Sequence, residues 1–264
     1  LVEENSKKTL QPRKIRLKRQ ITFISNLYLM KNKLILLRHG ESVWNLENRF
    51  TGWTDVDLTK NGENEAKKAG FLLSDNNIHF DLVYVSYLKR AIKTLKICLK
   101  QLKVIDNESV YHWRLNERHY GNLQGLNKSD TAKKYGDDQV LLWRRSYDVP
   151  PPKMDSNDKR HPKYDNLYKN VERQKLPDSE SLEDTLNRVK PLWLSQIVPE
   201  LKHGKNIMIV AHGNSLRAIV KILKKISAKD IIGINIPTGI PYIFEFNDNF
   251  SVKKDYFLGS QEDI

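Results

Sequence analysis

Two apolar stretches of strand length, far apart in the chain, run into the same dipeptide. Residues 34–37 are Leu-Ile-Leu-Leu and continue as Arg-His-Gly, while residues 206–211 are Asn-Ile-Met-Ile-Val-Ala and continue as His-Gly-Asn-Ser. Short apolar runs bounded by polar residues are typical of strands buried on both faces of a parallel sheet. Ligands of such sheets bind beyond the carboxyl ends of the strands, at a switch in strand order. If both strands lie near the middle of one sheet, His39 and His212 can therefore converge on one pocket.

Arg38, His39 and Gly40 suit chemistry at such a strand end. The imidazole is a candidate nucleophile and the guanidinium a candidate anion clamp. The glycine lets the backbone approach a ligand closely or turn with a positive φ. A single Arg-His-Gly also occurs in structural turns, because short motifs match by chance. The second His-Gly, at His212, is what favours the chemical interpretation.

The rest of the chain alternates strand and helix signals. Residues 80–86 and 242–246 are predicted to be further strands, because apolar and aromatic residues dominate them. Apolar residues at helical spacing predict a helix capped by Thr59, a helix over 88–102, one from 179–184 to about 198, one over 214–223 and a closing turn at 231–235. This alternation predicts an α/β fold, with three layers, α/β/α, around a mostly parallel central sheet.

At 264 residues the chain is long enough for one large domain with a substantial core. We place this domain at residues 30–264 and interpret residues 1–29 as a flexible, basic N-terminal extension. Residues 148–177 are rich in Pro, Lys and Asp and lack periodicity. Because long aperiodic segments in compact domains are usually functional loops or disordered, we expect a mobile loop or lid beside the site.

The formal net charge of +13 is concentrated at the N-terminus, where residues 1–33 hold nine Lys or Arg against two Asp or Glu. The smaller surplus that remains is ordinary for a protein that handles phosphorylated anions. No zinc finger, helix-turn-helix or ribonucleoprotein motif is found, so no nucleic-acid partner is predicted. No apolar stretch approaches the roughly 18 residues of a spanning helix, so no membrane role is predicted. The lone Cys98 cannot form an intrachain disulfide, and a cytoplasmic location fits.

Phosphoryl transfer through histidine needs one neutral imidazole as nucleophile, several cationic clamps and one acid/base near the leaving oxygen. Arg38, His39, Arg90, Glu117 and His212 provide that set. No His or carboxylate spacing matches a recognised metal motif, so no metal is predicted. The glycine-rich phosphate loops of nucleotide-binding proteins are also missing from the sequence, which argues against nucleotide chemistry of those types.

Several ordered motifs resemble the histidine phosphatase superfamily, and more narrowly the 2,3-bisphosphoglycerate-dependent phosphoglycerate mutases. They are Leu-Arg-His-Gly-Glu-Ser at 37–42, Asn45, Asn-Arg-Phe-Thr-Gly-Trp at 48–53, Asn-Glu-Arg-His-Tyr-Gly at 116–121, Ala-His-Gly-Asn-Ser at 211–215 and Asn-Ile-Pro-Thr-Gly at 235–239. The resemblance extends from about residue 30 to about residue 259 and implies the fold of that family. Residues 1–29 lie outside it.

The resemblance also implies a role for each matched residue. His39 would be the phosphohistidine and Glu117 the acid/base, while Arg38, Arg90 and His212 would bind the transferred phosphoryl group. The residues implied to hold the phosphoglycerate are Ser42, Asn45, Thr51, Gly52, Tyr120, Lys128, Arg144, Arg145, Gly213 and Asn214.

By the same resemblance the enzyme would interconvert 3-phosphoglycerate and 2-phosphoglycerate in glycolysis and gluconeogenesis. 2,3-Bisphosphoglycerate would prime the histidine, the partners would be small phosphorylated three-carbon acids, and the chain would form homodimers or homotetramers. Two alternatives within the superfamily are a bisphosphoglycerate synthase and a histidine-type phosphatase. Ser42, Thr51 and Gly52 match the mutase pattern rather than the synthase, and simple phosphatases often lack the segments at 48–53 and 143–145.

Overall fold

The computed structural model describes residues 32–106 and 108–263, so the expectation for residues 1–29 lies outside the described residues. The described chain contains one six-stranded sheet in the order β3-β2-β4-β1-β5-β6. Its strands are β1 (Lys33–Arg38), β2 (Leu82–Val85), β3 (Val110–Tyr111), β4 (Ile207–Ala211), β5 (Tyr242–Phe246) and β6 (Val252–Phe257). The two His-Gly strands, β1 and β4, are central neighbours.

The sheet is mostly parallel, as the sequence predicted. β1, β2, β3 and β4 run parallel, whereas β5 pairs antiparallel with β1 and β6 antiparallel with β5. The sequence analysis had no strand at β3 or β6. β3 has only two residues, and β6 contains three charged residues and is partly exposed at the sheet edge, so neither shows the continuous apolar run of a central strand.

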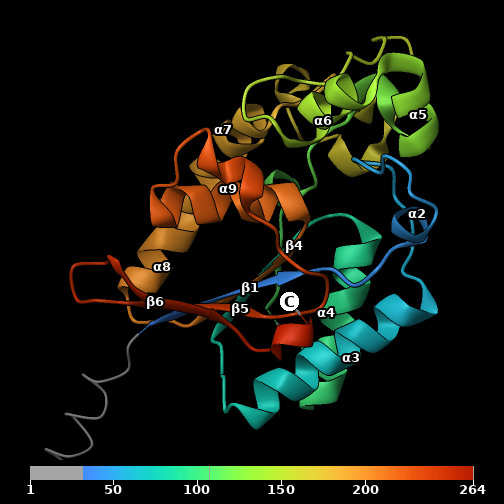
Figure 1. Ribbon diagram of the computed structural model, residues 1–264. Coiled ribbons are helices and arrows are strands. Elements are labelled where there is room, and N and C mark those ends of the chain that lie inside the picture. The colour runs from blue at the N-terminus through green and yellow to red at the C-terminus, as the bar shows by residue number, and fades with distance from the viewer. Residues whose placement is uncertain (1–31, 107, 264) are drawn as a thin grey trace, which may run out of the picture.

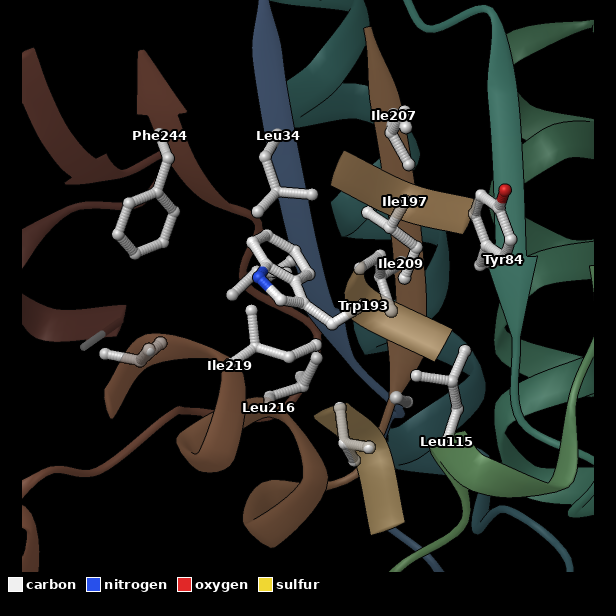
Figure 2. Close-up of a cluster of buried hydrophobic side chains, with 14 of the residues drawn as sticks. Leu34, Tyr84, Leu115, Trp193, Ile197, Ile207, Ile209, Leu216, Ile219 and Phe244 are labelled. Atoms are coloured by element: carbon white, nitrogen blue, oxygen red, sulfur yellow. The ribbon is translucent and has the colours of Figure 1, made fainter. Parts of the chain in front are cut away.

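Alternate residues of β1 pack on opposite faces of the sheet, and both faces are buried. Leu34 and Leu36 join a cluster with residues of β4 and of the helical segments 182–202 and 213–224. Figure 2 shows this cluster, with Trp193 close to Leu34. Ile35 and Leu37 join a second cluster on the other face. The apolar run at 34–37 therefore reflects burial on both sides, as expected of a central strand.

Helices cover these two faces and make the three predicted layers (Figure 1). α3 (Lys60–Asp75) and α4 (Lys89–Leu102) pack together on one face, and α7 (Leu182–Leu192), α8 (Val198–Lys202) and α9 (Gly213–Lys224) on the other. α3 begins after Thr59, whose side chain accepts a hydrogen bond from the Gly62 N–H, as the predicted cap requires.

The long helix predicted to reach about residue 198 is divided. α7 ends at Leu192, a π-helical turn spans Trp193–Ile197, and α8 follows. Pro191 lies inside α7. A proline there removes one backbone donor and clashes with the preceding turn, which accounts for the irregular continuation.

The described chain also contains three further short α-helices and the irregular segment 148–177. α2 (Val43–Leu46) follows β1, while α5 (Lys128–Tyr135) and α6 (Asp137–Arg145) lie together above the sheet in Figure 1. The segment 148–177 contains 3-10 turns at Pro162–Tyr164, Asn166–Tyr168 and Arg173–Lys175. Its Tyr168 and Leu176 pack in a buried cluster with Trp53 and Trp113. The mobility expected of this segment stays a prediction.

Candidate active site

The strand pairing brings the two histidines together. β1 and β4 are in register at Arg38 and Ala211, so the next residue of each strand, His39 or His212, leaves the sheet at the same edge. The two imidazole ring centroids lie 4.9 Å apart and the rings are inclined at 60°. Both side chains are buried. Residues 173 positions apart in the sequence thus form the floor of one site.

The hydrogen bonds of His39 identify which nitrogen is free to react. Nδ1 lies 2.7 Å from the carbonyl oxygen of Gly40, which can only accept, so Nδ1 carries the proton. Nε2 is then the bare nitrogen, and it accepts a bond of 3.3 Å from Nε of Arg90. Burial, followed by the charges of Arg90 and Arg38, holds the pKa of His39 well below its ordinary value. At neutral pH the ring is therefore neutral, and its bare Nε2 could act as a nucleophile.

Two guanidinium groups flank this ring. Arg38 donates from Nη1 to the Ile236 carbonyl at 2.8 Å. Arg90, in the first turn of α4, donates from Nη1 to Thr54 O at 2.9 Å and from Nη2 to Gly52 O at 2.8 Å. Burial lowers the pKa of Arg90 to about 10, so it keeps its charge at neutral pH. Backbone carbonyls thus hold both cations close to the His39 ring.

The pocket above the floor is strongly cationic. Its lining contains seven Arg or Lys residues against one carboxylate, Glu117. The lining residues are Arg38, His39, Asn45, Arg49, Thr51, Gly52, Arg90, Glu117, Tyr120, Lys128, Arg144, Arg145, Gly213, Asn214, Arg217, Asn235 and Ile236. Such a concentration of converging donors suits a ligand with several negative charges.

Glu117 sits where the floor meets helix α9. Its side chain is 9% exposed, and Oε1 accepts the backbone N–H of Arg118 at 2.7 Å and that of Asn214 at 3.2 Å. Asn214 is the second residue of α9, so one of these donors belongs to a helix amino terminus. The carboxylate is therefore fixed in orientation while it faces the pocket.

The rim of the pocket, which we define as α5 and α6, contributes Lys128, Arg144 and Arg145. Lys128 opens α5, and Arg144 and Arg145 close α6. Burial lowers the pKa of Lys128 from its ordinary value. These cations reach the pocket from elements that lie far in sequence from both histidines.

Tyr120 connects the rim to the floor. Its hydroxyl oxygen accepts from Nη2 of Arg118 at 3.0 Å and lies 3.5 Å from Nδ2 of Asn214. Burial alone would raise the pKa of this hydroxyl, but the charge of Arg118 and its hydrogen bond hold it below the ordinary value. A more acidic hydroxyl is a better hydrogen-bond donor to an anion.

Two of the expected site residues do not line the pocket themselves. His212 packs against the ring of His39, and Ser42 caps α2, where its hydroxyl accepts from the Asn45 N–H at 3.2 Å. Asn45 Oδ1 in turn accepts from the Ser42 N–H and hydroxyl. Ser42 therefore acts on the pocket through the orientation of Asn45.

Four lining residues were missed in the sequence analysis: Arg49, Arg217, Asn235 and Ile236. Arg217 donates to Asn214 Oδ1 at 2.9 Å and to Ile231 O at 2.6 Å. Burial lowers its pKa to about 10. Its spacing offered a signal, because a residue three or four positions after Gly213 and Asn214 shares their helix face.

Neither a metal site nor a membrane span is found in the described ranges. Residues 32–106 and 108–263 contain no group of three His, Cys, Asp or Glu side chains placed to hold a metal ion. In the same ranges, no helix is long and apolar enough to cross a bilayer.

Comparison with known proteins identifies the family. The model of the histidine phosphatase superfamily (branch 1) matches residues 34–161 and 153–256. These matches include both His-Gly strand ends and almost all of the described chain. The chain belongs to the histidine phosphatase superfamily.

Two named relatives of this chain are bacterial. A 2,3-bisphosphoglycerate-dependent phosphoglycerate mutase of Bacteroides fragilis is 56% identical over 232 residues, which cover 88% of this chain and 94% of that protein. A protein of the same name from Porphyromonas gingivalis is 55% identical over 232 residues, which again cover 88% of this chain and 94% of that protein. The similarity therefore spans nearly the whole length of both relatives.

Solved structures share the fold at much lower identity. A mycobacterial glucosyl-3-phosphoglycerate phosphatase in complex with VO3 superposes with a TM-score of 0.64 at 20% identity, covering 86% of this chain and 97% of that one. An alpha-ribazole phosphatase from Shigella flexneri gives 0.61 at 23% identity, covering 84% and 94%. At this level of identity the likeness shows the fold alone.

Proposed function

We propose that this protein is a 2,3-bisphosphoglycerate-dependent phosphoglycerate mutase that interconverts 3-phosphoglycerate and 2-phosphoglycerate. The observation that carries the proposal is the bare Nε2 of His39, set between Arg38 and Arg90 at the bottom of a pocket with seven cations and one carboxylate. The names of relatives at 55% and 56% identity support the substrate assignment.

In the proposed reaction Nε2 of His39 attacks the phosphorus of a bound phosphate ester. A nitrogen–phosphorus bond forms as the bond from phosphorus to the ester oxygen breaks. Charge on the transferring group spreads over its equatorial oxygens, so positioned cations supply most of the stabilisation. Arg38, Arg90 and His212 are proposed for this task because all three lie close to the His39 ring.

Glu117 is the proposed acid/base. It lines the same pocket as His39, and its Oε1 is held by two backbone N–H groups, which leaves Oε2 to face the reacting oxygen. As the carboxylic acid it gives a proton to the leaving oxygen. As the carboxylate it takes a proton from the hydroxyl that next attacks the phosphohistidine. One side chain can therefore serve both half-reactions.

The remaining predicted residues would hold the carboxylate and the second phosphate of the substrate. They are Ser42, acting through Asn45, together with Asn45, Thr51, Gly52, Tyr120, Lys128, Arg144, Arg145, Gly213 and Asn214. Arg144 and Arg145 are adjacent guanidinium groups and suit a planar anionic group gripped by paired donors. To this set we add Arg49 and Arg217.

2,3-Bisphosphoglycerate is the proposed primer. The number of cations in the pocket fits a small molecule with two phosphates and a carboxylate, since each such group is best matched by two or more charged donors. A bisphosphate held over His39 can lose either phosphoryl group to Nε2. Retention and reorientation of the product before the phosphoryl group returns would convert one phosphoglycerate into the other.

For the surroundings of the enzyme we propose a cytoplasmic location and assembly into homodimers or homotetramers. The location rests on the lone Cys98 and the assembly on the family resemblance, and a glycolytic role is consistent with both. Small phosphorylated three-carbon acids are the proposed partners. Sedimentation of the full chain at several concentrations tests the assembly.

A coupled mutase assay tests the function directly. Conversion of 3-phosphoglycerate is measured with and without added 2,3-bisphosphoglycerate, beside the release of inorganic phosphate. We expect conversion that depends on the bisphosphoglycerate and much slower release of phosphate. Phosphate release without isomerisation would indicate a phosphatase instead, and net formation of bisphosphoglycerate would indicate a synthase.

A further inference from the structure

A buried hydroxyl anchors the imidazole of His212. Its Nε2 lies 2.8 Å from Oγ of Ser86, the residue that follows β2. Both residues are fully buried, so water cannot complete the hydrogen bonds of either. A serine hydroxyl can donate or accept, and the direction of this bond decides which ring nitrogen of His212 carries the proton.

A backbone N–H settles the orientation of the next group, the amide of Asn116. The Tyr87 N–H, which can only donate, lies 3.1 Å from Oδ1 of Asn116. The amide atom at this position must therefore be the oxygen, because only the oxygen can accept this N–H. The same oxygen lies 2.9 Å from Oγ of Ser86. Because Oδ1 has no hydrogen, Ser86 must donate its proton to Asn116.

Ser86 then has no proton left to donate to His212. Its single hydroxyl proton points to Asn116, and its oxygen also accepts the Leu88 N–H at 3.2 Å. Towards Nε2 of His212, Ser86 can only accept. Nε2 of His212 consequently carries the ring proton, and Nδ1 is the bare nitrogen of the neutral ring.

The chain of hydrogen bonds ends in the segment 148–177. Nδ2 of Asn116 donates to the hydroxyl oxygen of Tyr168 at 2.9 Å. Asn116 is fully buried and Tyr168 is 3% exposed, so this bond too is closed to water. Tyr168 stacks near Trp53 with ring centroids 5.0 Å apart. The segment expected to be a lid thus reaches the catalytic floor through three side chains.

We propose that Ser86, Asn116 and Tyr168 are positioning residues that hold His212 as its Nε2–H tautomer. The two histidines of the floor are then opposite tautomers, since His39 has its proton on Nδ1 and its lone pair on Nε2. Nε2 of His39 is free to attack, and the Nε2–H of His212 is held by the Ser86 hydroxyl oxygen, which cannot donate to it. The chain of three residues acts through His212 and touches no substrate.

This tautomer has a consequence for the bound anion. The nitrogen of His212 not committed to Ser86 is Nδ1, which is an acceptor in the neutral ring. His212 can donate to a phosphoryl oxygen only after taking up a proton on Nδ1. Burial and the nearby Arg90 hold the pKa of His212 low, and an incoming dianionic phosphoryl group opposes the effect of the Arg90 charge. Binding of the anion and protonation of His212 are therefore coupled.

Ring ¹⁵N spectra of the full chain test the tautomer without any substrate. Protonated and bare ring nitrogens resonate far apart, and signals of His212 are assigned by their loss in His212→Gln. We expect Nε2 protonated and Nδ1 bare in the wild type. Addition of inorganic phosphate should move the Nδ1 signal towards its protonated position. A wild-type His212 with Nδ1–H and a bare Nε2 would overturn the proposal.

Three variants distinguish a positioning role from a purely structural role. Ser86→Ala removes the only acceptor of Nε2–H, so we expect the two tautomers of His212 to mix and kcat to fall by about ten- to hundredfold, with KM much less affected. Asn116→Asp keeps an oxygen that accepts from both Ser86 and Tyr87, and should retain the wild-type tautomer. Tyr164→Phe removes an exposed hydroxyl from the same segment as Tyr168 and should change neither readout.

The inference rests on the proposed function only for its effect on rate. A wild-type tautomer retained in Ser86→Ala would overturn the positioning role even if the mutase assay succeeds. Loss of the tautomer in Ser86→Ala, with no isomerisation by the wild type, would instead uphold the hydrogen-bond chain and overturn the proposed mutase activity.

Discussion

The floor at the ends of β1 and β4 and the rim formed by α5 and α6 face the same pocket but are positioned by different means. The floor depends on strand register, since pairing of Arg38 with Ala211 places the following histidines side by side. The rim depends on packing, through a small cluster that includes Phe50, Leu123 and Trp143. A register slip would disrupt the chemistry outright, whereas a shift of the rim would change how tightly the anion is held.

The difference assigns separate tasks. His39 and Glu117 belong to the part whose geometry is rigidly specified, and they make and break bonds in the proposed reaction. Lys128, Arg144 and Arg145 come from short helices and supply charge. Interactions made only in the transition state raise kcat, while those made equally in the ground state lower KM. Substitutions in floor and rim should therefore differ in kind as well as in size.

The largest effect is expected at the floor from His39→Ala. Removal of the nucleophile leaves no nitrogen to accept the phosphoryl group, so turnover should fall by at least about 10⁴-fold. The coupled mutase assay measures it, and circular dichroism confirms that the variant is folded. A variant with a tenth of the wild-type kcat would contradict the assignment of the nucleophile.

Glu117→Gln should have the next largest effect. The glutamine oxygen can still accept from the N–H groups of Arg118 and Asn214, so the geometry of the pocket is retained. The amide cannot exchange a proton, and the rate should fall by about 10²- to 10⁴-fold. Binding of inorganic phosphate, measured by calorimetry, should change little. Unchanged kcat would remove Glu117 as the acid/base.

At the rim, Arg144→Met should raise KM for 3-phosphoglycerate by about tenfold, because one charged hydrogen-bonding partner is lost. The backbone oxygen of Arg144 accepts from Arg118 at 2.6 Å, and this contact survives the substitution. Lys133→Met is the matched control, since Lys133 is an exposed cation on α5. A fall in kcat equal to that of Glu117→Gln would erase the distinction between rim and floor.

The pH dependence of the floor should be weak near neutrality. His39 is the nucleophile in its neutral form, and its pKa is lowered, so this form is lost only as the pH falls through a value well below 6.5. Single-turnover phosphorylation of Glu117→Gln by 2,3-bisphosphoglycerate, in which no acid at position 117 can titrate, should therefore proceed at similar rates at pH 8 and pH 6.5. A rate halved at pH 6.5, with the substrate's own ionisation allowed for, would argue against the buried neutral ring.

The smallest expected effect concerns the segment 148–177. If it is a mobile lid, cleavage by a protease should be faster in the free enzyme than with 2,3-bisphosphoglycerate bound. The packing of Tyr168 and Leu176 against Trp53 implies that any opening is a minor population. Equal cleavage rates in both states would contradict the lid.

The two strand ends of the floor were predictable from sequence because the pattern that marks each one lies within a few residues. Each His-Gly follows a run of apolar residues, and parallel strands bring their carboxyl ends to one edge. The helix after Thr59 was predictable for the same reason, since its cap and its spacing lie within a few residues.

Other parts of the site depend on contacts that no short pattern contains. Helical spacing places Arg217 on the face of Gly213 and Asn214, but packing decides that this face of α9 covers the floor. Arg118 is likewise buried against a carbonyl of α6. The irregular segment 148–177 has no periodicity, yet Tyr168 is placed by aromatic packing and by Asn116. Resemblance to a family named ten residues proposed to hold the substrate, but it did not reveal Ser86 beside His212.

The most direct test of the account is the site of covalent phosphorylation. The enzyme is mixed with 2,3-bisphosphoglycerate, quenched at alkaline pH, where phosphohistidine survives, and digested for tandem mass spectrometry. The account predicts one acid-labile phosphate on the peptide that contains residues 34–40, located at His39 and missing in His39→Ala. A phosphate found on the peptide with His212, or a label retained by His39→Ala, would contradict it.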